Sequence, residues 1–222
     1  MERMEAPPLK IALLGAESTG KTRLCAELAH WLRSQGRSVA VVPEVLREWC
    51  MREGRTPRPQ EQLPIAQEQE RRVDQAAATA QIVISDTTSL MVAIYSAMLF
   101  GDGTLYRFAL QRQRGYDVTL LTGLDLPWVA DGLQRDGPHV REPVDALVRE
   151  ALARADVPFR TVYGRGEERL ANALAAIAGA VPGLQVADST RAQAARPWVW
   201  TCDKCGDPEC EHRLFTSLAG RR

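Results

Sequence analysis

The feature that most constrains this chain is an apolar run that leads directly into a glycine-rich loop. Leu9–Leu14 reads as a buried strand, and the next eight residues, Gly15–Thr22, spell G-A-E-S-T-G-K-T. A strand, then G-x-x-x-x-G-K-T, then a helix is the arrangement that binds nucleotide phosphates. A chance glycine-rich turn is the alternative, but the flanking strand and the apolar helical stripe after the loop supply the context that the motif requires.

Each position of this loop has an expected task. The glycines let the backbone curl around an anion, and the amides at the start of the helix point at it, where the helix dipole also favours negative charge. Lys21 is expected to reach the β- and γ-phosphates, and the Thr22 hydroxyl to bind Mg²⁺. ATP and Mg²⁺ are therefore the predicted ligands. The predicted nucleotide-binding residues are Gly15, Ser18, Thr19, Gly20, Lys21, Thr22 and, later in the chain, Arg141.

Strands and helices alternate after the loop. Apolar strands are expected at 38–42, 81–86, 118–122 and 159–163, with helices between them. This alternation predicts an α/β fold of the P-loop NTPase type, a mostly parallel sheet of about five strands with helices on both faces. The second strand is expected to end beside the first, and residues 67–72 are expected on the solvated side of a helix over 60–80.

The predicted domain organisation has three parts: residues 1–180 form the nucleotide-binding domain, 181–197 a linker and 198–222 a cysteine-bearing tail. The 28 basic and 28 acidic residues balance, so we expect no global field that attracts nucleic acid or an anionic membrane. The sequence contains no run of about 18 apolar residues and no apolar signal-peptide core near Met1, so a cytoplasmic location is expected. Cys25 and Cys50 fall on helices and are expected to be buried.

Asp86 ends one of the apolar strands. An acidic residue there is the expected partner of the phosphate loop and holds Mg²⁺ directly or through a water. A strand-terminal Asp is also a common helix cap. Because a phosphate loop is present, the metal role is favoured, with Thr22 and Asp86 as the magnesium ligands.

The segment Pro43–Trp49 follows the second strand and reads P-E-V-L-R-E-W. Phosphoryl transfer to a hydroxyl needs a carboxylate to orient and deprotonate the acceptor and a guanidinium to offset charge. Glu44 suits the first role, and Arg47 and Glu48 complete the predicted acceptor-binding set. A merely solvated acidic start of a helix is the alternative.

The segment Trp128–Arg141 is polar and holds two glycines, two arginines and a proline. It resembles a lid that closes over a triphosphate, excludes water and inserts arginine where charge develops. Arg135 and Arg141 are the candidate lid arginines, with Arg135 joining Lys21, Glu44 and Asp86 in the predicted catalytic set. An ordinary surface loop explains the same composition.

The tail contains C-x₂-C-x₄-C-x-H, formed by Cys202, Cys205, Cys210 and His212. Three thiolates and an imidazole complete a tetrahedral Zn²⁺ shell with no open position, which is typical of a structural zinc site. A reduced cluster without metal, or a redox switch through the first two cysteines, remains open.

With these residues placed, the chain resembles the ribosylnicotinamide kinase domain of the NadR family and its stand-alone relatives. The matching stretches are G-A-E-S-T-G-K-T at 15–22, P-E-V-L-R-E at 43–48, I-S-D-T-T at 84–88, D-V-T-L-L at 117–121 and W-V-A-D-G-L-Q-R at 128–135. The resemblance implies Mg²⁺-dependent transfer of phosphate from ATP to the 5′-hydroxyl of a nucleoside such as nicotinamide riboside, in NAD biosynthesis. Thr88 departs from the pattern, since a second acidic residue is expected there.

Two functions follow. The first is a nucleoside kinase whose partners are ATP and a small-molecule acceptor, with homo-oligomer formation possible. The alternative is an ATP hydrolase that acts as a regulatory module, with the tail offering a surface to a partner. Acceptor-dependent release of ADP distinguishes the two.

Overall fold

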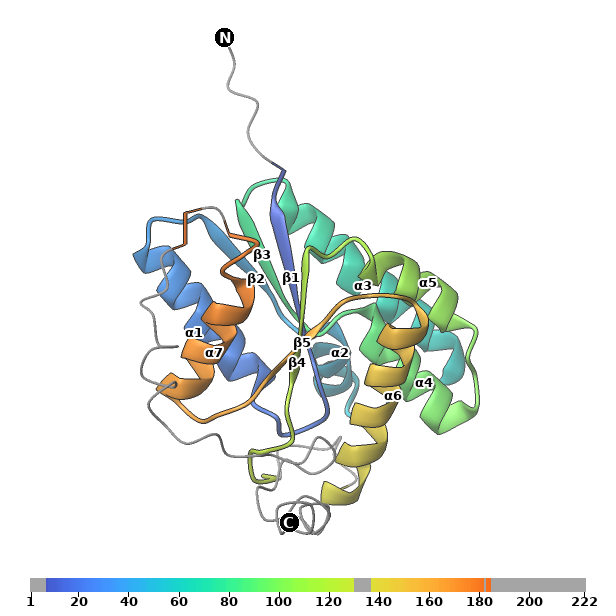
Figure 1. Cartoon of the computed structure of the whole chain (residues 1–222). Coiled ribbons are helices and arrows are strands. Elements are labelled where there is room, and N and C mark those ends of the chain that lie inside the picture. The colour runs from blue at the N-terminus through green and yellow to red at the C-terminus, as the bar shows by residue number, and fades with distance from the viewer. Residues whose placement is uncertain (1–6, 130–136, 182, 185–222) are drawn as a thin grey trace, which may run out of the picture.

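The computed structural model describes residues 7–129, 137–181 and 183–184. Within them, five parallel strands form one sheet in the order β2-β3-β1-β4-β5. The predicted α/β fold with a parallel sheet of about five strands is confirmed (Figure 1). The strands are β1 (Leu9–Leu14), β2 (Val39–Val42), β3 (Ile82–Asp86), β4 (Val118–Thr122) and β5 (Arg160–Val162).

Helices cover both faces of this sheet (Figure 1). On one face lie α1 (Lys21–Ser34) and α7 (Glu167–Ile177); the other carries α2 (Val45–Glu53), α3 (Pro59–Ala77), α4 (Ser89–Phe100), α5 (Leu105–Gln113) and α6 (Arg141–Arg154), with the short helix η1 (Pro138–Val140) leading into α6. The central strand β1 serves both cores, since Ile11 and Leu13 pack towards α1 and Leu14 packs towards α4. Burial on both faces is what makes these strands read as continuous apolar runs. None of the described helices is both long and apolar enough to cross a membrane.

The strand order corrects one expectation. β3 lies between β1 and β2, because Leu13 is paired with Asp86 and Val42 is paired with Ser85. Asp86 is therefore the residue beside the phosphate loop, and the end of β2 lies one strand further away. A long helical crossover predicts a parallel pair of strands, and strand twist makes the connection right-handed. Neither rule prevents another strand from lying between the two.

The polar face predicted for α3 is also partly wrong. Gln69 and Glu70, which belong to the stretch expected on the solvated side, are only 1% and 3% exposed, whereas the apolar Leu63 of the same helix is 42% exposed. The reason is that α3 is covered on two flanks: Gln69 bonds to the backbone at the start of α2, and Glu70 bonds to the start of α4. Cys25 and Cys50 are buried, as predicted.

Candidate active site

The phosphate loop connects β1 to α1 and depends on its glycines. Gly15 and Gly20 have φ angles of 145° and 75°, a region that side chains disfavour. A Cβ atom on Gly15 would lie 2.1 Å from Thr122 Oγ1. Thr19 Oγ1 lies 2.7 Å from the same hydroxyl oxygen and donates to the carbonyl of Ala16 at 2.8 Å. The loop is thus packed tightly against the end of β4.

Lys21 lies folded back over the loop. Its Nζ donates to the carbonyl oxygens of Gly15 and Ala16, both at 2.8 Å, and the residue is 8% exposed. These contacts hold the ammonium group at the mouth of the loop, close to where the sequence predicts phosphates. A rotation about its flexible stem is enough to exchange loop carbonyls for phosphate oxygens.

Thr22 and Asp86, the predicted magnesium ligands, are brought together by the fold. Thr22 Oγ1 donates to Asp86 Oδ2 at 2.5 Å. The other carboxylate oxygen, Oδ1, is buried and has no hydrogen-bond partner among the described residues. A buried carboxylate oxygen without a partner is costly, and an Asp carboxylate beside a threonine hydroxyl is the donor set that Mg²⁺ uses at phosphate loops. The residues present therefore fit this metal.

Glu44 stands directly before α2, with its side chain 14% exposed. Arg47 Nε donates to its Oε2 at 3.2 Å. Burial raises the pKa of Glu44 above its ordinary value, while the positive charges of Lys21 and Arg47 lower it and the Asp86 carboxylate raises it further. Glu44 therefore shares one electrostatic environment with Lys21 and Asp86, although β3, which ends in Asp86, lies between β2 and β1.

Gln69 on α3 connects these two parts of the site, and the sequence analysis missed it. Its Oε1 accepts from the backbone N–H of Val45 at 2.9 Å, and its Nε2 donates to Ser85 Oγ at 3.2 Å. Gln69 therefore ties the start of α2, just after Glu44, to the strand that ends in Asp86. Its position inside a polar helical run gave no signal of this role in the sequence.

Glu48 has a different setting. Its Oε2 accepts from Arg72 Nη1 on α3 at 2.5 Å, and Arg72 also binds Glu68. The side chain is 45% exposed. The acceptor role expected of Glu48 stays a prediction.

The lid segment is described in part. Arg141 opens α6, is 8% exposed and donates from Nη2 to the carbonyl of Leu124 at 3.1 Å. Burial lowers the pKa of Arg141 from its ordinary value. At the other end of the segment, Ser18 Oγ of the phosphate loop donates to the Val129 carbonyl at 2.6 Å. Arg135 and the tail residues Cys202, Cys205, Cys210 and His212 lie outside the described residues, and the lid and zinc site stay predictions.

Thr88, the departure from the family pattern, is a helix cap. Its Oγ1 accepts from Leu90 N at 3.2 Å and donates to Gln113 at 2.7 Å. The carboxylate at this helix start comes from Glu70 instead, whose Oε1 accepts from the N–H and the hydroxyl of Ser89 at 3.0 and 2.6 Å. A negative charge there complements the helix dipole. Within the described ranges, no group of three or more His, Cys, Asp or Glu side chains is placed to hold a metal.

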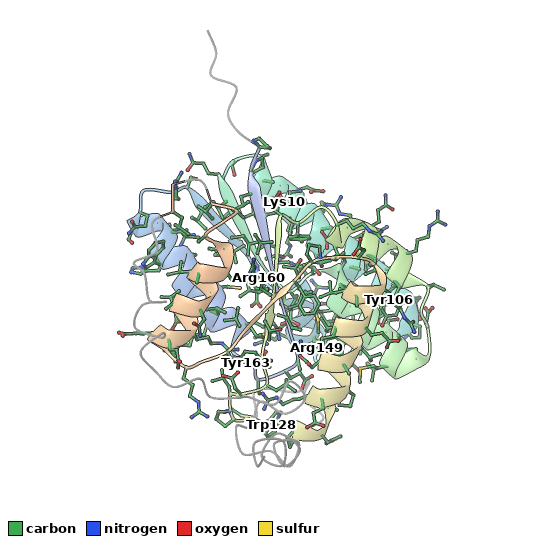
Figure 2. The ribbon with its side chains drawn as sticks, viewed as in Figure 1. Lys10, Tyr106, Trp128, Arg149, Arg160 and Tyr163 are labelled. Carbon is green, nitrogen blue, oxygen red and sulfur yellow. The ribbon has the colours of Figure 1, made fainter. Side chains whose placement is uncertain are left out.

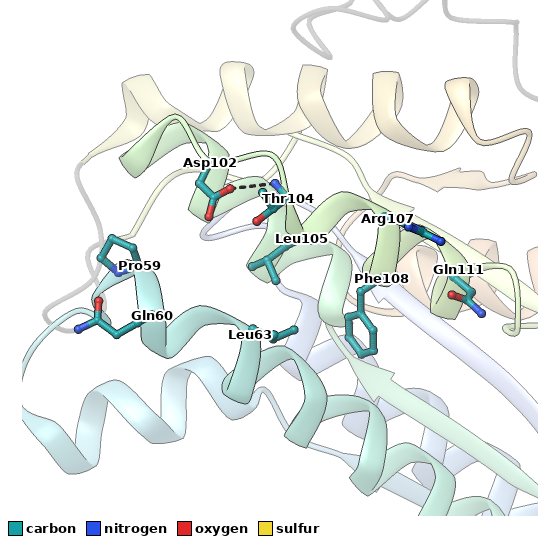
Figure 3. A pocket seen from close by; sticks show the side chains of 9 residues that line it. All are labelled: Pro59, Gln60, Leu63, Asp102, Thr104, Leu105, Arg107, Phe108 and Gln111. Atoms are coloured by element: carbon teal, nitrogen blue, oxygen red, sulfur yellow. Dashed lines mark hydrogen bonds between the residues drawn. The ribbon is translucent and has the colours of Figure 1, made fainter.

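A separate surface pocket lies between the starts of α3 and α5 (Figure 3). It has a volume of about 600 Å³ and is lined by Pro59, Gln60, Leu63, Asp102, Thr104, Leu105, Arg107, Phe108 and Gln111. No residue of the phosphate loop lines it, and it takes no part in the arrangement described above.

Comparisons with known proteins agree with this geometry. The sequence model of a family described as an AAA domain matches residues 10–169. No curated protein sequence matches the chain. Two solved structures of the NadR protein are similar in fold, one in complex with NR and one with NAD and AMP-PNP. Their TM-scores are 0.66 and 0.65, at 16% and 17% identity, and the matches cover 81% and 82% of this chain.

This chain spans 52% of the length of each NadR structure. A third structure, deoxyadenosine kinase from M. mycoides with products dCMP and a flexible dCDP bound, has a TM-score of 0.53 at 16% identity. That match covers 77% of this chain and 100% of the other. At these identities the likeness concerns the fold.

Proposed function

We propose that this chain, which belongs to the AAA-domain family, is an ATP- and Mg²⁺-dependent kinase of a nucleoside. The sequence model of that family matches residues 10–169. The group transferred is the γ-phosphate, the acceptor is the 5′-hydroxyl, and nicotinamide riboside is the first candidate substrate. One observation carries the proposal: Asp86 accepts from Thr22 of the phosphate loop, and the buried carboxylate of Glu44, from a different strand end, feels the charges of both Lys21 and Asp86. The NadR and deoxyadenosine kinase folds support the same reaction class.

The residues divide into two groups by role. The loop amides and Lys21 hold the triphosphate, and Thr22 and Asp86 are the residues that would hold Mg²⁺. When bound, Mg²⁺ neutralises charge on the β- and γ-phosphates. Glu44 accepts the proton of the attacking hydroxyl, a role that its raised pKa favours because a base works best near the operating pH. Arg47 orients Glu44, and Arg135 and Arg141 offset charge from the lid.

The test is a panel of nucleosides offered with ATP and Mg²⁺, with ADP release measured above the rate without acceptor. We expect release that depends on the nucleoside, together with a product that carries a 5′-phosphate. Equal rates with and without every nucleoside would identify an ATP hydrolase that acts as a regulatory module, and would overturn the kinase proposal.

We also propose a cellular setting for the protein and a metal for its tail. A kinase of this kind would act in the cytoplasm in NAD biosynthesis, and it could assemble as a homo-oligomer. The tail Cys202, Cys205, Cys210 and His212 would hold one structural Zn²⁺, since its ligand types and spacing suit a closed tetrahedral site. Elemental analysis of the full chain purified without chelator tests this, with one zinc per chain expected and a value near zero contradicting it.

A further inference from the structure

A buried arginine on α7 connects three loops behind the phosphate site. Arg169 is 4% exposed. Its Nη2 donates to the carbonyl of Thr19 in the phosphate loop at 2.7 Å, and its Nη1 donates to the carbonyl of Gly164 at 3.0 Å and to Asp125 Oδ1 at 3.1 Å. The fork of one guanidinium thus joins the loops that follow β1, β4 and β5.

Asp125 fixes the direction of this fork. While Oδ1 accepts from Arg169, Oδ2 accepts from the backbone N–H of Gly164 at 2.7 Å. Asp125 belongs to the segment after β4 that also packs on the phosphate loop, since a Cβ atom on Gly20 would meet Leu126 Cδ1 at 3.0 Å. Figure 2 shows Trp128, from this segment, and Tyr163, from the end of β5, at the same end of the molecule.

The contact with Thr19 has a consequence for the loop amides. In a trans peptide the carbonyl oxygen and the next N–H point in opposite directions. Because the Thr19 oxygen accepts from Arg169, the N–H of Gly20 is directed away from this guanidinium, and we infer that it faces the predicted phosphates. A buried ion pair such as Arg169 with Asp125 contributes little net stability, so stability alone does not account for this arrangement.

We propose that Arg169, oriented by Asp125, is a positioning residue that sets the amides of the phosphate loop for binding the polyphosphate of ATP. The inference rests on the proposed function only in that the loop binds ATP. Arg169 acts through the Thr19–Gly20 peptide and does not itself touch the nucleotide.

The test measures dissociation constants of the full chain for ATP, tripolyphosphate and adenosine, with Mg²⁺ present and no acceptor. We expect Arg169→Gln to weaken ATP and tripolyphosphate binding by about tenfold, the size of one lost charge-assisted hydrogen bond, and to leave adenosine binding unchanged. Arg169→Lys keeps the charge but not the fork, so we expect the same loss. Arg165→Gln is the matched control, because exposed Arg165 donates, among the described residues, to the Asp125 carbonyl at 3.2 Å and not to the phosphate loop. We expect less than about a twofold change for it.

Three results would overturn the inference. Wild-type affinity for ATP in Arg169→Lys would mean that only the charge matters, and equal losses of ATP affinity in Arg169→Gln and Arg165→Gln would mean that the contact with Thr19 does not. A loss of adenosine affinity in Arg169→Gln equal to the loss for ATP would mean a general structural defect. If Arg169→Gln does not fold, the ratio of tripolyphosphate affinity to adenosine affinity is measured in Arg169→Lys and Asp125→Asn instead. We expect this ratio to fall below that of the wild type, and an unchanged ratio would overturn the inference. A wild-type chain that binds ATP but phosphorylates no nucleoside contradicts the proposed function and leaves this test intact.

Discussion

The two sides of the candidate site differ in how well their polar groups are satisfied. On the phosphate side, Lys21 donates to two loop carbonyls, the Thr19 hydroxyl bonds to Ala16 and Thr122, and the Thr19 carbonyl accepts from Arg169. The exception there is Arg169 Nε, which is buried without a partner among the described residues. On the metal and acceptor side, Asp86 Oδ1 is buried without a partner within the described residues, and burial raises the pKa of Glu44.

This difference separates two kinds of preorganisation. The phosphate side is held in shape by the protein alone, so ligands need only replace the contacts of Lys21. The other side keeps buried negative charge whose cost, about 1–3 kcal/mol for an unsatisfied polar group, a cation or a hydroxyl would relieve. Changes on the phosphate side should therefore reduce stability or nucleotide affinity, and changes on the other side should reduce turnover.

The largest expected effect follows from Asp86→Asn. We expect acceptor-dependent ADP release to fall by about 10³-fold or more, because the carboxylate that would hold the metal is lost. The melting temperature should not fall, since the substitution removes a buried charge with an unpartnered oxygen. Steady-state rates across a Mg²⁺ titration and thermal unfolding measure the two properties. Asp74→Asn is the control, because Asp74 pairs with Arg112 and with Lys10, which lies near the start of β1 and not at the end that leads into the phosphate loop. A large loss of stability in Asp86→Asn would contradict the comparison.

Glu44→Gln is the next in size. Removal of a general base lowers kcat by about 10²-fold or more, while KM for ATP should stay the same because the phosphate loop is intact. Glu53→Gln, at the exposed end of the same helix, is the matched control and should keep wild-type kinetics. A kcat for Glu44→Gln within about twofold of wild type would remove Glu44 from the acceptor site.

The sequence predicts the position of the phosphate loop well because its signal is local. Gly15, Gly20, Lys21 and Thr22 lie in eight consecutive residues between an apolar strand and a helix, and each has an expected task set by backbone conformation or charge. Asp86 was also predictable, because it ends an apolar strand in a parallel sheet, where ligands gather.

The rest depends on tertiary contacts that no local pattern encodes. The strand order, which places β3 next to β1, is decided by packing between strands distant in sequence. Gln69 and Arg169 look like ordinary polar residues of solvated helices, and only the fold shows that each is buried against a loop from elsewhere. α5 was not expected, because its nine residues carry a weak apolar stripe between polar neighbours.

A smaller effect, on the free energy of unfolding, is expected from a substitution on the phosphate side. In Gly15→Ala the new Cβ atom would lie 2.1 Å from Thr122 Oγ1 at a positive φ angle. We expect a loss of about 2–4 kcal/mol in the free energy of unfolding, from steric overlap added to backbone strain. Gly36→Ala is the matched control, because Gly36 also has a positive φ but nothing within 4 Å of the added atom, and should lose only about 1 kcal/mol. If urea denaturation gives equal losses of unfolding free energy for Gly15→Ala and Gly36→Ala, the close contact with β4 does not contribute to the loss.

The smallest expected effect is a pH dependence of stability on the acceptor side. The pKa of Glu44 is raised in the folded chain, so folding favours its protonated form, and this contribution is lost as the pH rises through the folded pKa. Glu44→Gln should therefore gain stability relative to wild type as the pH rises above the ordinary pKa range of a carboxyl group. Glu68 provides the opposite sign, because hydrogen bonds from Arg71 and Arg72 lower its pKa to about 2; the stability it gives is lost as the pH falls towards that value. Urea denaturation of Glu44→Gln and Glu68→Gln against pH separates the two effects. A pH-independent difference between Glu44→Gln and wild type would mean that Glu44 carries no buried charge.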